Sequence, residues 1–124
     1  MFKDTKAFSG FAVDDMAKAR EFYAQTLGIR VTDENGLLTL QLADGDRPTM
    51  IYPKPDFEPA TYTILNFPVA DIDEAVDALI ERGVDFEIYE GFGQDEKGIS
   101  RDAGPPIAWF RDPAGNILSV LQLD

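Results

Sequence analysis

A repeated segment constrains the fold of this chain more than any other feature. The run from Val13 to Ile29 is echoed by the run from Val69 to Val84. In each copy a strand-like stretch ends in Val-x-Asp, the aspartate opens a helix, and a glycine (Gly28 or Gly83) closes it. A tandem unit of this kind defines the architecture before any single residue is weighed.

Apolar residues recur at spacings of three and four in both copies, which predicts two amphipathic helices. Asp14 or Asp15 can cap the first helix, and Asp71 caps the second. Tyr23 lies within the first apolar stripe and is expected in the core. The two stripes are Met16, Ala19, Phe22, Tyr23 and Leu27, and then Ile72, Ala75, Val76, Leu79 and Ile80.

Extended runs flank each helix in the same order, so the sequence predicts an α+β protein with one domain over residues 1–124. Each module should be strand, helix and three further strands. Module one spans about 1–53, a proline-containing linker 54–60, and module two about 61–124. The expected strands are 6–13, 29–32, 37–42 and 49–52, and then 62–69, 84–89, 107–110 and 117–123.

The second module carries about a dozen extra residues, which fall in a loop over 90–106 that is rich in glycine and charge. Loops of this length in a small domain are often functional. Solvated loop charge is the plainer interpretation. The alternative is a lid over a binding site, with Phe92 and Arg101 as its contacting residues.

Composition excludes several classes of function. The formal net charge is −12, which disfavours nucleic acid and anionic membranes as partners. No apolar stretch approaches a membrane span. The chain has no cysteine and no histidine, so a disulfide framework and a serine–histidine triad are both excluded. We expect a cytoplasmic protein.

Certain motifs resemble those of the vicinal oxygen chelate superfamily, which includes glyoxalases, extradiol dioxygenases, fosfomycin-modifying enzymes and bleomycin-resistance proteins. They are Val-x-Asp, the pair Phe22–Tyr23, the pair Leu27–Gly28, and WFRDPAGNILSVLQ near the C-terminus. The resemblance implies two tandem βαβββ modules that form a curved mixed sheet around a cleft. It also implies a homodimer.

Enzymes of that superfamily hold one divalent metal with histidine and glutamate side chains. The resemblance puts the corresponding positions at Phe8, Ile64 and Ser119, with Ile51 (or, one residue away, Met50 or Tyr52) as the fourth. None of these side chains is an imidazole or a carboxylate. The sequence therefore predicts no metal, no other cofactor and no catalytic residue of the family's type.

The cleft should instead be lined by apolar and neutral polar groups. Alternation along the strands adds further lining positions to the four that correspond to metal ligands. One of the added positions is either Gln41 or its neighbour Leu40. Trp109 could be core or a ligand wall, and Asn66 could satisfy backbone or orient a ligand. The full expected set is Phe8, Gly10, Gln41, Ile51, Ile64, Asn66, Trp109, Ser119 and Leu121.

Three functions fit these observations. The first is metal-independent binding of a small, largely apolar molecule in the inter-module cleft, for sequestration or sensing, as in bleomycin resistance. The second is a lyase or isomerase that works without a histidine-bound metal and uses a carboxylate or tyrosine as its base. The third is a non-catalytic structural or regulatory dimer.

Overall fold

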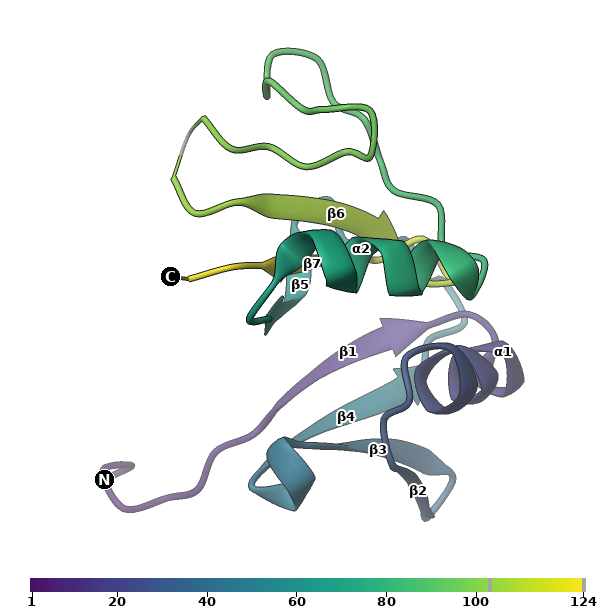
Figure 1. The fold of residues 1–124 in the computed structure, drawn as a ribbon. Coiled ribbons are helices and arrows are strands. Elements are labelled where there is room, and N and C mark those ends of the chain that lie inside the picture. Colours follow the sequence, from purple (N-terminus) through teal and green to yellow (C-terminus); the bar gives the residue numbers. More distant parts are fainter. Residues whose placement is uncertain (103, 124) are drawn as a thin grey trace. The chain divides into compact units, whose positions relative to one another are not determined.

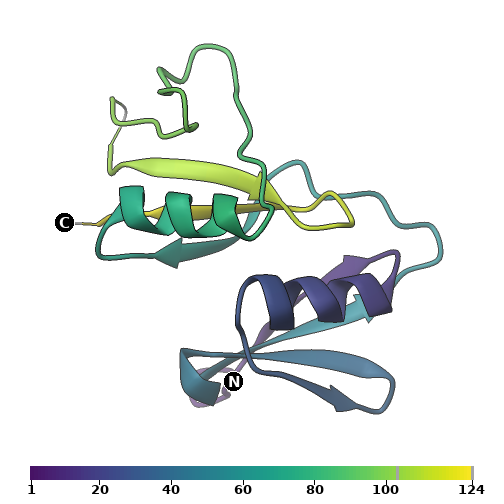
Figure 2. The same ribbon diagram turned by 45° about the vertical axis from the view of Figure 1, so that its right-hand side comes forward.

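The structure is a computed structural model, and it describes residues 1–102 and 104–123. The chain divides into two compact units, Met1–Phe57 and Glu58–Asp124. Each unit packs one helix against one face of a mixed sheet (Figures 1 and 2). The predicted α+β class is confirmed. In the described part of the chain, no helix is long and apolar enough to cross a membrane.

The first unit has a four-stranded sheet in the order β1-β4-β3-β2. β1 runs parallel to β4, and the remaining pairs are antiparallel. A single 3₁₀ turn over Ala43–Gly45 joins β3 to β4. The elements are β1 (Ser9–Val13), α1 (Met16–Glu21), β2 (Val31–Glu34), β3 (Leu37–Leu42) and β4 (Arg47–Pro53).

The first helix begins and ends as its sequence indicates. The Asp15 carboxylate caps α1 by accepting a hydrogen bond from the Lys18 backbone N–H, at 3.0 Å. After α1 the chain makes a π-helical turn, Phe22–Thr26, and stops at Gly28, whose φ of 71° suits glycine. Tyr23 is fully buried with its ring centroid 5.7 Å from that of Phe11, which confirms its place in the core.

The second unit has a three-stranded sheet in the order β5-β7-β6, with β5 parallel to β7 and β6 antiparallel to it. Asp71 caps α2 by accepting from the Glu74 backbone N–H at 3.1 Å, as Asp15 does for α1. The repeat is therefore visible in structure as well as in sequence. The elements are β5 (Thr63–Pro68), α2 (Ile72–Glu81), β6 (Ile107–Arg111) and β7 (Ile117–Leu121).

The predicted strand over 84–89 is wrong. This stretch touches β6 through a single bridge, Phe86 to Phe110, and through the Glu87 N–H, which donates to the Trp109 carbonyl at 2.8 Å. The side chain of Gln94 forms hydrogen bonds with the Tyr89 backbone N–H and the Glu87 carbonyl, in place of pairing with another strand. The segment therefore runs as coil beside β6 (Figure 2).

The turn RDPAGN between β6 and β7 is held by its own side chains. The Asp112 carboxylate, almost fully buried, accepts from the backbone and side-chain N–H groups of Asn116 at 2.8 and 3.1 Å. The side-chain oxygen (Oδ1) of Asn116 in turn accepts from the Ala60 backbone N–H at 3.1 Å. This turn therefore fixes the start of the second unit to the β6–β7 hairpin, which is a structural role.

Strand alternation separates the two faces of each sheet. One face packs on the helix of its unit and is buried. Its residues are Phe11, Val13, Leu38, Leu40 and Ile51 in the first unit, and Ala108, Phe110, Leu118 and Val120 in the second. We refer to the opposite faces as the first open face and the second open face.

Candidate functional site

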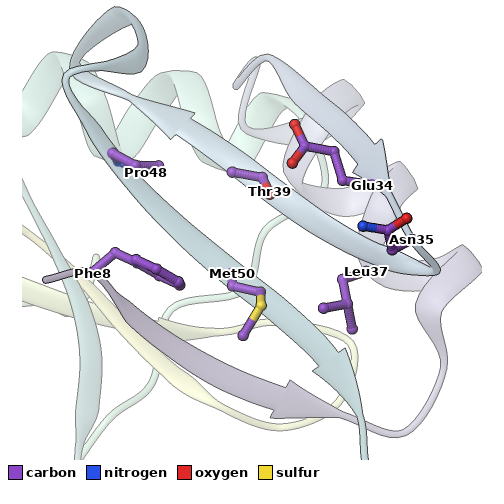
Figure 3. A pocket seen from close by; sticks show the side chains of 7 residues that line it. All are labelled: Phe8, Glu34, Asn35, Leu37, Thr39, Pro48 and Met50. Atoms are coloured by element: carbon purple, nitrogen blue, oxygen red, sulfur yellow. The ribbon is translucent and has the colours of Figure 1, made fainter. Parts of the chain in front are cut away.

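The first open face carries a shallow apolar pocket. Gly10, Met50 and Thr39 form one row across β1, β4 and β3. A Cβ at Gly10 would lie 3.1 Å from the Met50 carbonyl oxygen, so glycine permits this close strand approach. The pocket, of about 270 Å³, is lined by Phe8, Glu34, Asn35, Leu37, Thr39, Pro48 and Met50 (Figure 3).

Figure 3 shows that Phe8, Met50 and Leu37 supply most of the apolar wall, whereas Glu34 and Asn35 stand at the β2–β3 turn. Phe8 is 63% exposed. Glu34 is the one ionisable side chain among the lining residues. The first open face is therefore an open apolar surface with a carboxylate at one end.

The second open face carries an aromatic pocket. The rings of Tyr89 and Phe92 each meet Trp109 edge to face and are tilted to one another, with centroids 5.3 to 5.7 Å apart. Phe92 and Tyr89 come from the long loop and its approach, and Trp109 comes from β6. The pocket, of about 420 Å³, is lined by Thr61, Tyr62, Thr63, Tyr89, Phe92, Trp109 and Ile117, none of which carries a charge at neutral pH.

A polar row crosses the same face beside the aromatic pocket. Asn66 on β5, Ser119 on β7 and Trp109 on β6 are direct cross-strand neighbours. The Ser119 hydroxyl donates to the Asn66 side-chain oxygen at 2.6 Å. Ser119 is fully buried, whereas Asn66 is exposed. A fixed amide therefore stands two strands away from the indole.

Gln94 holds the aromatic loop in place. Its side-chain oxygen accepts from the Tyr89 backbone N–H at 2.6 Å, and its amide group donates to the carbonyls of Glu87 and Gly98 at 2.7 and 2.8 Å. These three bonds join both ends of the loop segment that carries Phe92. The rings are thus positioned by a side chain instead of by a strand.

The far part of the loop is tied to α2. The Arg101 guanidinium donates to the Asp73 carboxylate at 3.0 and 3.1 Å, and the Lys97 ammonium lies 2.8 Å from the Asp77 carboxylate. The hydrogen bond that the Lys97 ammonium donates to Asp77 raises the pKa of Lys97. Arg101 therefore does not line the aromatic pocket. Of the two expected lid residues, Phe92 alone lies there.

Arg111 is paired at the edge of the second sheet. Its guanidinium donates to the Glu87 carboxylate at 2.7 Å and to the Gly115 carbonyl at 2.8 Å. The Glu87 hydrogen bond raises the pKa of Arg111 above its ordinary value. The charge of Arg111 is thus compensated next to the pocket, which leaves the pocket wall itself neutral.

The structure brings most of the predicted lining residues onto the two open faces. Phe8, Gly10 and Gln41 lie on the first, where Gln41 donates to the Thr32 hydroxyl at 3.0 Å. Asn66, Trp109, Ser119 and Leu121 lie on the second. Ligand contact by these residues stays a prediction.

One predicted lining residue lies on the buried face, and a second is assigned to neither face. Ile51 is fully buried on the helix side of β4, and Met50 occupies the open position beside it. The reason is the register between the two halves, in which an error of one residue reverses the face of a strand. Ile64 falls at the register shift between Thr63 and Leu65, so simple alternation does not assign its direction.

Several pocket residues were missed in the sequence. Tyr62 lies directly before β5 and Thr63 is its first residue. Tyr89 is the last residue of the stretch 84–89, which forms no strand. The sequence carried one signal for Tyr89. It lies three residues before Phe92, and both precede the strand that carries Trp109, the only tryptophan in the sequence. Without the Gln94 contacts, that proximity could not be read as a pocket wall.

Comparison with known proteins agrees with this geometry. The sequence model of the Glyoxalase/Bleomycin resistance protein/Dioxygenase superfamily matches residues 8–120. The chain belongs to this superfamily. None of the curated protein sequences compared with it matches.

Solved structures share the fold over almost the whole chain. TnmS3, an antibiotic binding protein from Streptomyces sp. CB03234, is 24% identical with a TM-score of 0.72, covering 96% of this chain and 97% of its own. The fosfomycin resistance protein FosX from Mesorhizobium loti is 14% identical with a TM-score of 0.65, over 96% and 92%. A superfamily member from Sphaerobacter thermophilus is 25% identical with a TM-score of 0.68, over 94% and 96%.

The side chains at the superfamily's metal positions do not fit a divalent cation. Phe8, Met50 and Ser119 offer a ring, a thioether and a hydroxyl that is already hydrogen-bonded to Asn66. Across residues 1–102 and 104–123, no group of three or more histidine, cysteine, aspartate or glutamate residues is placed to hold a metal ion. We therefore derive no chemical step through a metal.

Proposed function

We propose that this protein binds a small, largely apolar molecule, for sequestration or sensing and without a metal, and that the second open face supplies the binding surface. The observation that carries the proposal is the aromatic pocket on the second open face. Three packed rings supply broad apolar walls, and uncharged hydroxyl groups surround them. Ligand sites generally combine such walls with a few orienting polar groups.

The lining chemistry favours binding over catalysis. The aromatic pocket has no carboxylate, lysine or histidine side chain among its lining residues, so the hydroxyls of Tyr62 and Tyr89 are the only general bases that it could offer. A lyase or isomerase needs a general base within hydrogen-bond reach of its substrate. The similarity in fold to TnmS3, an antibiotic binding protein, is consistent with a binding role for this superfamily fold.

The assembly we propose is a homodimer, as is usual in the small members of this superfamily. Each unit leaves one sheet face without a helix, and a two-fold pairing of chains would complete a cleft over these faces. Light scattering at micromolar concentration should then give twice the mass of one chain. A mass of one chain across that range would contradict the dimer.

The binding proposal can be tested with N-phenyl-1-naphthylamine, a neutral apolar probe whose fluorescence rises on leaving water. We expect saturable binding that Trp109→Leu weakens and that dialysis against EDTA leaves unchanged. Ile88→Ala is the matched control, because Ile88 is 64% exposed in the same loop and does not line the pocket.

Two outcomes would contradict the proposal. Absence of saturable probe binding by the folded wild type would remove the apolar site. Loss of binding after EDTA, with recovery on adding a divalent metal, would remove the metal-independent part.

A further inference from the structure

The polar row on the second open face restricts which aromatic ligand fits, and this inference rests on the proposed binding function. Ser119 is fully buried, and its hydroxyl is engaged by the Asn66 side-chain oxygen at 2.6 Å. That bond occupies the acceptor end of the Asn66 amide. It therefore turns the NH₂ end, with its two donors, outward from the sheet.

The outward NH₂ group of Asn66 is available to a ligand. Asn66 is exposed, and among the described residues its amide nitrogen has no protein partner. The Trp109 indole N–H likewise has no protein partner in residues 1–102 and 104–123. The row therefore presents hydrogen-bond donors at Asn66 and Trp109, while the Asn66 side-chain oxygen is anchored on Ser119.

The spacing suits one flat molecule. Asn66 and Trp109 stand on strands separated by β7, so their backbones lie about 10 Å apart. A fused two-ring system placed against Trp109 and Phe92 would bring a substituent near the Asn66 amide. A carbonyl oxygen there would accept the hydrogen bond that the row offers.

The electrostatics of the pocket select against an anionic ligand. None of the seven residues that line it is a lysine or arginine. The neighbouring Arg111 charge is compensated by Glu87. A carboxylate on the ligand would lose hydration without gaining a cationic partner, and it would meet the negative faces of the rings. The net charge of −12 disfavours an anion further.

We propose that the second open face selects an aromatic compound that bears a carbonyl acceptor and no carboxylate, with its rings on Trp109 and Phe92 and its carbonyl at the Asn66 amide. Ser119 is a positioning residue in this account, because it acts through Asn66 by fixing the direction of the amide. Gln94 positions Tyr89 and Phe92 in the same sense.

The test uses three probes of one shape: 2-acetylnaphthalene, 2-ethylnaphthalene and 1-(2-naphthyl)ethylamine. They differ in carrying a carbonyl, no polar group and an ammonium at the same branch. Each is titrated into the ¹⁵N-labelled full chain. The Asn66 side-chain NH₂ and the single indole N–H of Trp109 both give signals that report contact directly.

We expect 2-acetylnaphthalene to bind about three- to tenfold more tightly than 2-ethylnaphthalene, the range for one hydrogen bond in a partly exposed site. It alone should shift the Asn66 NH₂ signals, whereas both should shift the Trp109 indole. In Asn66→Asp, which removes the donors at an exposed position, the preference for the carbonyl should vanish. In Ser119→Ala it should fall, because the amide is then free to turn.

The outcomes separate the two proposals. Equal binding of the acetyl and ethyl probes with a shifted Trp109 signal would overturn the carbonyl selection and leave aromatic binding intact. Tightest binding of the amine would likewise overturn the selection for a carbonyl acceptor. Absence of any shift at Trp109 with all three probes would overturn both the selection and the binding site.

Discussion

The two units share one plan on their helix faces and differ on their open faces. Both helices begin at an aspartate cap, and both sheets bury apolar residues against the helix. The first open face is an exposed apolar surface ending in Glu34, whereas the second is an aromatic pocket with a neutral polar row. Packing against a helix constrains residue type, and a face without that constraint is free to acquire a specific chemistry.

The long loop makes the second open face different. In the first unit β2 forms the fourth strand beside β3, whereas in the second unit the stretch 84–89 runs as coil. Because Gln94 replaces strand pairing there, Tyr89 and Phe92 fold over Trp109. In the second unit a loop that carries aromatic rings therefore replaces the strand that completes the sheet of the first unit.

The largest expected effect is on stability and should be equal in the two units. Tyr23→Ala in the first and Phe110→Ala in the second each remove a fully buried ring from the core of the unit. Each should lower the free energy of unfolding by about 3–5 kcal/mol, from lost burial and the cavity left behind. Urea denaturation measures this. A loss below about 1 kcal/mol in either would contradict the shared plan.

Substitution on the open faces should separate the units. Trp109→Leu should weaken binding of N-phenyl-1-naphthylamine by about 1–3 kcal/mol, because the indole is a wall of the aromatic pocket. Phe8→Leu should weaken it by about 0.5 kcal/mol or less, because Phe8 is 63% exposed on the first face. Fluorescence titration of both variants provides the comparison. Equal losses would mean that the two faces bind alike.

The helix caps should again be equivalent. Asp15→Ala and Asp71→Ala each remove the acceptor of one backbone N–H at a helix start. Each should lower the free energy of unfolding by about 1 kcal/mol. Replacement by asparagine, which keeps an acceptor oxygen, is the matched control and should restore most of the loss. A cap effect in one unit alone would weaken the parallel between the repeats.

The smallest expected effect concerns the part of the loop tied to α2. Arg101→Ala removes an exposed ion pair with Asp73, which should change the free energy of unfolding by about 0.5 kcal/mol or less. Probe affinity should stay unchanged, because Arg101 does not line the pocket. Phe92→Ala serves as the contrast and should weaken binding. A clear affinity loss in Arg101→Ala would restore it as a lid residue.

The helix faces were predictable from sequence, and the open faces were predictable only in part. Apolar spacing identified both helices and the burial of Tyr23, because one face of a helix must be covered. The position of Ile51 could not be fixed, since a register error of one residue reverses a strand. The absence of a strand over 84–89 depends on the side-chain contacts of Gln94, and no local sequence pattern predicts these contacts.

The central claim is that an aromatic ligand sits on the second open face. Nuclear Overhauser effects between bound N-phenyl-1-naphthylamine and the protein test it most directly. We expect strong nuclear Overhauser effects to the ring protons of Trp109 and Phe92, because both residues line the aromatic pocket. Strong effects to the Met50 methyl group on the first open face, with none to Trp109, would contradict it.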